Sequence, residues 1–225
     1  NDMYIYDILT ETYLPGNNIS TPRERAGLAV NGSDIYIIGG RNENGYLKSI
    51  EIYNNKSGEI SSMTDLPYEI VDSQAYFYND TLYVIGGTDY NGYSNKVYAF
   101  KNNQWVEKQS MPYSSKYIRG SEYNGNFFCA AVNNQGNVDI LKYDTETDKW
   151  TVLISNYIND LIYYAAEILD GYMYITGGYS YESNTVVNSV YTYDCVTDTS
   201  TIDKSIPVRS IGFEYEQTID SNNIK

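Results

Sequence analysis

The feature that most constrains this chain is an internal repeat of about 46 residues. Three apolar runs end in a glycine pair, at 35–40, 82–87 and 173–178, and a degenerate fourth run lies at 127–132. The last residues of successive copies are 47, 45 and 46 positions apart. Such periods arise when one supersecondary unit cannot bury its apolar surface alone and packs against copies of itself. The chain is therefore expected to be an array of similar units.

Two further markers keep the same spacing. A short segment ending in an aromatic residue, usually followed by Asp or Asn and a polar turn, occurs at Tyr6, Tyr53, Phe100, Tyr143 and Tyr193. An aliphatic residue precedes proline at 14–15, 66–67, 111–112 and 206–207. Each unit thus contains four short strands separated by Gly, Asn and Asp turns, without any stretch of helical period. The predicted fold class is all-β.

The apolar runs before the glycine pairs are apolar at successive positions rather than alternating. A strand of this kind is expected to be buried on both faces, between neighbouring sheets. The glycine pairs then permit a positive φ or a close backbone approach where a β-carbon would collide. A phosphate-binding role would need a following helix, and the pattern predicts none.

A glycine pair, a tyrosine, a tryptophan and an aliphatic–proline pair at this spacing resemble the Kelch repeat. The resemblance covers the whole chain and is strongest in the units ending at Gly40 and Gly87. It is weakest where Ala131-Val132 replaces the glycines and where Ile60 or Ser200 stands in place of Trp. The resemblance implies a Kelch-type β-propeller.

The expected organisation is a single domain, 1–225, with four complete four-stranded blades and two half blades. The approximate units are 1–16 (half), 17–67, 68–112, 113–155, 156–207 and 208–225 (half). Two arrangements stay open at this point. A strand at 212–218 could complete the N-terminal half and close a five-bladed ring, or the chain could be a fragment of a six- or seven-bladed ring. Closure is preferred because an open stack would leave two strand edges unpaired.

Composition limits the partners. The formal net charge of −14 argues against nucleic acid and against anionic membrane surfaces, because both attract cationic proteins. No run of about 18 apolar residues is present, so no membrane insertion is expected. The two cysteines, Cys129 in a core strand and Cys195 in an outer turn, are not expected to meet. A monomer is expected, and the Asn-, Tyr- and Ile-rich composition favours a bacterial secreted or cell-surface protein.

Function in a propeller belongs to loops rather than strands. The resemblance implies that ligands meet the loops between second and third strands and the loops between blades. The first set comprises 41–47, 88–94, 133–137 and 179–185. The second set comprises 16–25, 68–72, 113–119, 156–163 and 208–210.

These loops are rich in Tyr, Asn, Gly and Ser, which combine flat aromatic surfaces with adaptable hydrogen-bonding groups. The simpler interpretation is that they only turn the chain. We expect a non-catalytic binding module for a protein segment or a glycan. The candidate ligand-binding residues are Arg41, Asn44, Tyr46, Asp89, Tyr90, Tyr93, Tyr113, Arg119, Tyr157, Tyr179 and Tyr181. Arginines on these loops could hold an acidic peptide, but each is expected to form an ordinary intramolecular ion pair.

An enzyme is the alternative. Sialate mutarotase-like activity is known among Kelch propellers and could use the loop carboxylates of Glu43, Asp89 or Glu182. No paired motif singles these residues out, so no catalytic residue, metal site or cofactor is predicted. The absence of histidine excludes a copper oxidase of the galactose-oxidase kind for this segment. The acidic stretch 144–148 matches the outer turn of the other units and is interpreted as a turn.

Overall fold

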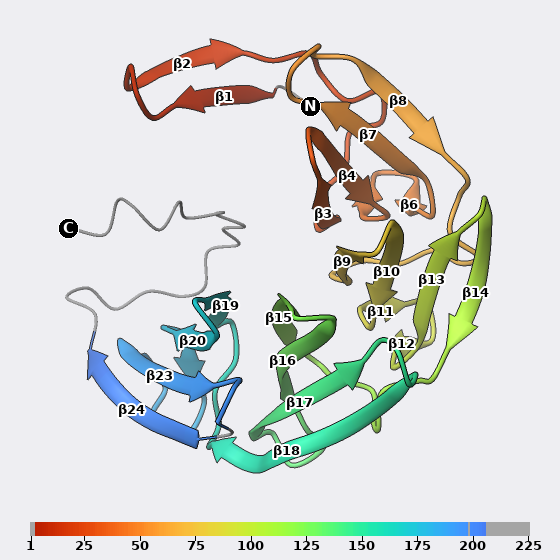
Figure 1. Cartoon of the computed structure of the whole chain (residues 1–225). Helices are drawn as coiled ribbons and strands as arrows, with labels where there is room; N and C mark the ends of the chain where they lie inside the picture. The colour runs from red at the N-terminus through yellow and green to blue at the C-terminus, as the bar shows by residue number, and fades with distance from the viewer. Residues whose placement is uncertain (1–2, 198, 206–225) are drawn as a thin grey trace. The chain divides into compact units, whose positions relative to one another are not determined.

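The computed structural model describes residues 3–197 and 199–205 and is all-β, as predicted (Figure 1). It contains four antiparallel four-stranded sheets, in which the strands follow one another in chain order. Sheet 1 is β3 (Gly27–Asn31), β4 (Asp34–Ile38), β7 (Ile50–Asn54) and β8 (Ile60–Met63). Sheet 2 is β9 (Gln74–Tyr78), β10 (Thr81–Ile85), β13 (Val97–Lys101) and β14 (Gln104–Lys108). Sheet 3 is β15 (Ile118–Tyr123), β16 (Asn126–Val132), β17 (Val138–Asp144) and β18 (Lys149–Ile158). Sheet 4 is β19 (Ala165–Leu169), β20 (Tyr172–Thr176), β23 (Ser189–Asp194) and β24 (Thr199–Ser205).

Four two-stranded hairpins accompany these sheets. They are β1 (Tyr4–Asp7) with β2 (Thr12–Pro15), β5 (Arg41–Asn42) with β6 (Gly45–Tyr46), β11 (Thr88–Asp89) with β12 (Gly92–Tyr93), and β21 (Tyr179–Ser180) with β22 (Thr185–Val186). The predicted N-terminal half unit corresponds to β1 and β2. The predicted strand at 212–218, the half unit 208–225, its loop 208–210 and the proline marker at 206–207 lie outside the described residues. Within the described ranges there is no helix that could cross a membrane.

The chain divides into two compact units. Unit 1 contains the described residues up to Ile118 together with Glu146–Trp150, and therefore includes sheets 1 and 2. Unit 2 contains Arg119–Thr145 and the described residues from Thr151 onward, which form sheet 4 and most of sheet 3.

Short turns of Asn, Asp and Gly define the hairpins within each sheet. Between β9 and β10, Asn79 and Asp80 have φ angles of 46° and 56°. Between β13 and β14, Asn102 and Asn103 have φ angles of 51° and 63°. Two consecutive residues with positive φ match the right-handed twist of the flanking strands, and Asn and Asp tolerate that conformation better than other non-glycine residues.

The turn between the third and fourth strands uses a side-chain oxygen instead. Oδ1 of Asn54 accepts hydrogen bonds from the backbone N–H groups of Lys56 (3.1 Å) and Ser57 (2.9 Å). Oδ1 of Asp194 does the same in sheet 4, with Val196 (2.8 Å) and Thr197 (3.0 Å). The aromatic–Asp/Asn marker is therefore a turn device, because the short polar side chain replaces a backbone acceptor. The segment 144–148 is a turn of the same kind of hairpin, as predicted.

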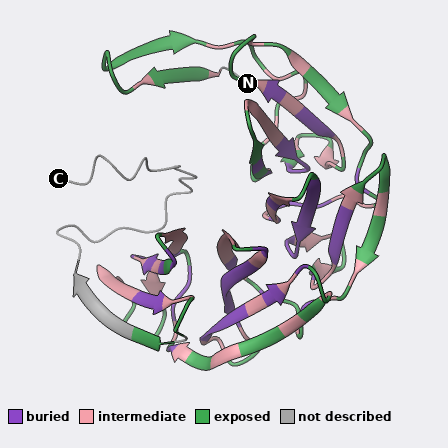
Figure 2. Cartoon of the chain, in the orientation of Figure 1, coloured by how far each residue is buried: buried purple, intermediate pink, exposed green. Residues whose placement is uncertain are grey.

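In sheets 1, 2 and 3, burial falls from the second strand to the fourth strand (Figure 2). Every residue of β10 is buried, and so are all residues of β16 except the first, which confirms the prediction for these two strands. The prediction that both faces are buried is only partly met in β4, whose first three residues are half-buried, and in β20, where the buried Met173 and Ile175 alternate with the half-buried Tyr174 and Thr176. Alternation of this kind is typical of a strand with one covered face.

The core of unit 1 lies between sheets 1 and 2. Its buried members come from β3, β4, β7 and β10 and from the connection between the two sheets: Ala29, Ile38, Ile50, Leu66, Ile70, Leu82 and Val84. Rings of Tyr36 and Phe77, one from each sheet, pack with centroids 4.6 Å apart. Leu66 belongs to the aliphatic–proline marker, so this marker supplies a core residue where the chain passes from one sheet to the next.

Tryptophan at the fourth strand connects successive sheets. Nε1 of Trp105, in β14, donates to the carbonyl of Thr64, which follows β8. Nε1 of Trp150, in β18, donates to the carbonyl of Gln109, which follows β14. The same hydrogen bond at the same repeat position explains why an indole, which has a ring and a donor, suits this position better than phenylalanine.

Candidate interaction surface

The connections between second and third strands carry small hairpins in sheets 1, 2 and 4. These hairpins, β5–β6, β11–β12 and β21–β22, occupy three of the predicted loops. The fourth loop, 133–137, is a short turn without a hairpin, because β16 continues to Val132 where the other sheets have glycines. Sheet 3 thus differs in the region where the sequence repeat is degenerate.

The turns of the two unit 1 hairpins are built alike. Oδ1 of Asn42 accepts the backbone N–H of Asn44 at 2.9 Å, and Oδ1 of Asp89 accepts that of Asn91 at 2.6 Å. A glycine follows in each case, and Gly45 has a φ of 122°. Asn-Gly therefore fixes the hairpin turn, since a β-carbon disfavours that φ.

Each hairpin is held at its base by the loop that enters the same sheet. One residue of that loop and the first residue of the hairpin exchange both backbone hydrogen bonds, with N···O distances of 2.8 to 3.0 Å. Such paired bonds limit how far the hairpin can move. The three bridges join Glu24 to Arg41 and Val71 to Thr88 in unit 1, and Ile162 to Tyr179 in unit 2.

Two predicted binding residues, Tyr46 and Tyr90, contact each other across neighbouring hairpins of unit 1. Their rings are stacked, with centroids 4.5 Å apart and planes inclined by 16°. Oη of Tyr90 accepts the backbone N–H of Tyr46 at 2.9 Å. A β-carbon on Gly45 would lie 2.5 Å from this hydroxyl, so Gly45 gives the ring room to approach. Tyr90 nevertheless remains 68% exposed.

Tyr93, which pairs with Thr88 in the β11–β12 hairpin, is also exposed. We call Tyr46, Tyr90 and Tyr93 the aromatic platform. Its rings come from two hairpins whose turns and bases are fixed by hydrogen bonds. An exposed aromatic group held in this way loses little conformational entropy on binding.

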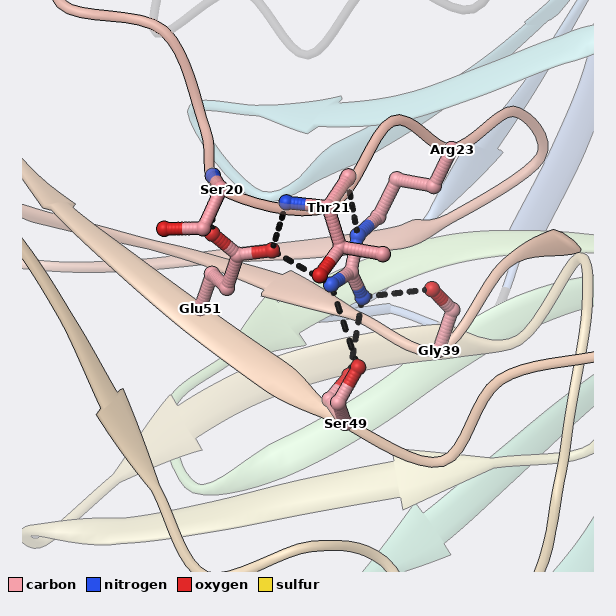
Figure 3. Close-up of polar contacts among 6 residues, drawn as sticks. All are labelled: Ser20, Thr21, Arg23, Gly39, Ser49 and Glu51. Atoms are coloured by element: carbon pink, nitrogen blue, oxygen red, sulfur yellow. Dashed lines mark hydrogen bonds and ion pairs between the residues drawn. The ribbon is translucent and has the colours of Figure 1, made fainter. Parts of the chain in front are cut away.

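Beneath these loops, the Arg23 side chain is enclosed and uses all of its hydrogen-bond donors (Figure 3). Nε donates to the carbonyl of Thr21 (3.3 Å), and Nη1 to the carbonyls of Gly39 (2.8 Å) and Ser49 (2.9 Å). Nη2 donates to Oγ of Ser49 (3.1 Å) and to Oε1 of Glu51 (2.6 Å). Only 1% of the Arg23 side chain is exposed. Arg23 therefore ties the entering loop to both ends of the hairpin loop and is unavailable to a ligand.

The partner carboxylate, Glu51 in β7, is equally engaged. Its side chain is 6% exposed, and it accepts the backbone N–H groups of Ser20 (2.6 Å) and Thr21 (2.9 Å). Burial by itself raises the pKa of Glu51, but these two N–H groups and the Arg23 guanidinium outweigh burial and lower the pKa below the ordinary value of 4.5. Glu51 is thus a buried anion that organises the loop at 20–23.

The other two arginines of these unit 1 loops are also paired. Arg25 donates to both carboxylate oxygens of Asp72, and this hydrogen bonding raises the pKa of Arg25 further. Nε of Arg41 donates to Oε1 of Glu24 at 2.6 Å. The expectation of intramolecular ion pairs is confirmed for Arg23, Arg25 and Arg41.

An open groove of about 800 Å³ lies beside the Arg41–Glu24 pair. It is lined by the loop at 20–24 and by the hairpin residues at 41–44. Predicted binding residues Arg41 and Asn44 line this groove, while Tyr46 belongs to the same hairpin. The structure therefore brings part of the candidate set in unit 1 together, on two adjacent hairpins and the groove next to them.

Other candidates have structural roles or lie in strands. Tyr157 and Arg119 were expected in loops, but they lie in β18 and β15, which extend further than predicted. The hydroxyl of Tyr157 donates to the carbonyl of Thr192 at 3.0 Å, which makes Tyr157 part of the packing of unit 2. Tyr113 is half-buried in the connection after β14.

In unit 2, Tyr179 and Tyr181 pack edge to face with centroids 5.3 Å apart. The hydroxyl of Tyr179 donates to Oδ1 of Asn184 at 2.5 Å, whereas Tyr181 is 53% exposed. The tip of the β21–β22 hairpin is held by Asp160, whose Oδ2 accepts hydrogen bonds from Ser180 and from the backbone of Glu182.

The carboxylates considered for acid–base chemistry show no catalytic arrangement. Glu43 is exposed at the β5–β6 turn, and Asp89 holds the β11–β12 turn. The side chain of Glu182 is exposed at the β21–β22 turn. Among the residues that the structure describes, no group of three or more carboxylate or cysteine ligands could hold a metal ion.

Successive antiparallel four-stranded sheets, packed face to face in unit 1 and joined from fourth strand to first, are the blades of a β-propeller. The chain belongs to the Kelch repeat family, whose model, described as the Kelch motif, matches residues 22–64, 77–112 and 161–202, more than half of the chain. The matches omit sheet 3, where the glycine pair is missing.

Curated relatives agree with this family. The chain is similar to Kelch-like protein 36 of Bos taurus, with 26% identity over 206 residues that cover 86% of this chain and 33% of the relative. It is also similar to Kelch-like protein 15 of Danio rerio, with 25% identity over 218 residues that cover 85% of this chain and 36% of the relative. The chain spans about a third of the length of these relatives.

The Arg23–Glu51 pair was not among the features predicted from the sequence. A signal was present, because Glu51 stands between Ile50 and Ile52 in the short segment that ends at Tyr53, and a charge flanked by apolar residues in a core strand needs a partner. Nothing in the local pattern of Gly45, in contrast, indicates that Tyr90 packs against it from 45 residues away.

Proposed function

We propose that this chain is a protein-interaction module that holds a segment of a partner protein on the aromatic platform of unit 1. The observation that carries the proposal is the stacked pair of the half-buried Tyr46 and the exposed Tyr90, formed by neighbouring hairpins. Tyrosine is enriched at protein interfaces because it offers a large apolar face and a polar tip with few rotatable bonds.

The rigidity of the surrounding loops supports the proposal. The two hairpins are fixed by the bridges Glu24–Arg41 and Val71–Thr88, and the loop entering sheet 1 is held by the Arg23–Glu51 network. A surface ordered before binding costs less free energy to engage. Membership of the Kelch family points in the same direction, because strands in a propeller supply the scaffold and loops supply the binding surface.

A protein segment is favoured over an enzyme substrate. The loop carboxylates lie on separate turns, and the groove at 20–24 and 41–44 is open rather than enclosed. Catalytic sites usually exclude water and group their titratable residues. A glycan is the alternative ligand for the same surface, since flat tyrosine rings also stack on sugar faces.

The test is selection of a random 12-residue peptide library, displayed on phage, against the purified chain. Clones retained by the chain are re-measured on Tyr46→Ala/Tyr90→Ala. We expect binding of most clones to fall by about tenfold or more, because central aromatic contacts contribute on the order of 1 to 3 kcal/mol each.

A matched control is Tyr78→Ala, which removes a half-buried tyrosine at the β9–β10 turn. It should leave the same clones bound within about twofold. If the platform variant keeps its clones, or if only a glycan array gives binding that depends on Tyr90, the proposal of a peptide-binding platform is wrong.

A further inference from the structure

Four positively charged groups around the aromatic platform already have partners within the chain. The guanidinium groups of Arg23, Arg25 and Arg41 already bind Glu51, Asp72 and Glu24, respectively. Lys96 lies with its ammonium group 5.2 Å from the ring centroid of Tyr68. An acidic ligand would have to compete with these internal partners for every one of these four cations.

Two carboxylates flank the platform without a cation of their own among the described ion pairs. Glu43 is exposed two residues before Gly45, the glycine against which Tyr90 packs. Asp89 directly precedes Tyr90, and its Oδ1 accepts a single backbone N–H, that of Asn91. One cation, Lys48, is exposed at the far end of the β5–β6 loop.

The carboxylates favour a cationic ligand, and the exposed faces of the tyrosine rings favour a cation as well. The face of an aromatic ring carries negative potential, so it attracts a guanidinium or ammonium group placed over it. A tyrosine pair flanked by carboxylates therefore favours a cation twice, through the ring faces and through the carboxylates. The net charge of −14 also attracts a cationic ligand from a distance and so favours its association with the chain.

We infer that the partner segment is cationic, with a Lys or Arg side chain placed on the Tyr46–Tyr90 face and close to Glu43 and Asp89. This inference rests on the proposed function and names its ligand class. The long methylene stem of such a residue lies against the tyrosine ring, and its charged end reaches the carboxylates.

The test uses the peptides whose binding depends on Tyr46 and Tyr90. We expect them to contain Lys and Arg about threefold more often than the unselected library, and to be poor in Asp and Glu. Synthetic copies should bind about tenfold more weakly to Glu43→Gln/Asp89→Asn, since an exposed ion pair contributes about twofold to fivefold in affinity. Asp89→Asn keeps the Oδ1 acceptor for Asn91 and removes only the charge.

The control variant Glu59→Gln/Asp80→Asn removes two charges from turns that join other strands, and it should change binding less than twofold. Lys48→Gln should leave binding unchanged or strengthen it. If the platform-dependent peptides are neutral or acidic, or bind equally to Glu43→Gln/Asp89→Asn, the inference is wrong while the platform stands. If no peptide depends on the platform, the proposed function itself fails and this inference with it.

Discussion

At the scale of single residues, the Arg23–Glu51 pair explains how a polar loop is fixed above an apolar strand. Both charges are almost completely withdrawn from water, which costs free energy unless every lone pair and donor finds a partner. Here five N–H groups of one side chain and two backbone N–H groups meet that requirement. The pair therefore specifies the conformation of residues 20–23 more than it adds to stability.

Replacing Glu51 by Gln is expected to destabilise the chain by about 3 kcal/mol at pH 7, because the Arg23 guanidinium loses its buried counter-charge. The pKa of Glu51 is lowered on folding, so the unfolded chain binds the proton more readily. The stabilisation is therefore complete above pH 4.5 and is lost as the pH falls through the folded pKa.

Urea denaturation between pH 7 and pH 3 measures this effect. The free energy of unfolding should fall more steeply with acid in the wild type than in Glu51→Gln, and the gap between the two should narrow below pH 4.5. Parallel curves for the two proteins would show that the Glu51 carboxylate does not stabilise the fold.

At the scale of elements, the glycine pair ends the second strand of a blade and lets a neighbouring loop approach. Gly87 follows β10 with a φ of 90°, and a β-carbon there would lie 2.6 Å from the carbonyl oxygen of Val71. The adjacent Thr88 exchanges two backbone hydrogen bonds with Val71. The pair therefore allows the bridge that holds each hairpin.

We expect Gly87→Ala to destabilise the chain by about 3 kcal/mol or more, from backbone strain plus overlap with the Val71 carbonyl. The matched control is Gly32→Ala in the β3–β4 turn, where φ is also positive, at 61°, but no atom lies within 4 Å of the added carbon. It should cost about 1 kcal/mol, the conformational strain alone.

Chemical denaturation of both variants gives the comparison, provided that the m-values stay equal to that of the wild type. Equal losses at the two positions would mean that close approach contributes nothing and that glycine at position 87 is explained by its φ alone.

At the scale of the whole molecule, we propose that the chain folds as one domain of repeated blades. Sheets 1 and 2 share one core in unit 1, as expected of repeats that bury their apolar surface against a neighbour. Fourth-strand tryptophans join one blade to the preceding one by the same hydrogen bond. Both features favour cooperative unfolding.

The two units can be followed separately. Trp105 and Trp150 belong to unit 1, and a maleimide dye can report unit 2 from Cys195. Cys129 should not react in the native state, because it is fully buried and burial raises the pKa of its thiol. We expect the tryptophan and dye signals to give coincident urea transitions. Two separated midpoints would instead show that the units unfold independently.

The sequence by itself determined the repeat, the all-β class and many of the turns between strands. These are local properties: β-strand patterns, Asn-Gly turns, Asx turns and glycine pairs act over a few residues and recur at a fixed period. The same reasoning placed Arg119 and Tyr157 in loops and was wrong, because β15 and β18 run further than their apolar pattern suggests.

Only the tertiary structure decided which loop residues meet. The stacking of Tyr46 on Tyr90 joins hairpins of neighbouring blades, and the pairing of Arg23 with Glu51 joins a loop to a strand 28 residues later. Those contacts depend on how one sheet packs on the next, which a pattern of single residues does not encode. For that reason the sequence could not show that Tyr90 stacks on the half-buried Tyr46, or that Arg23, Arg25 and Arg41 are engaged in internal ion pairs.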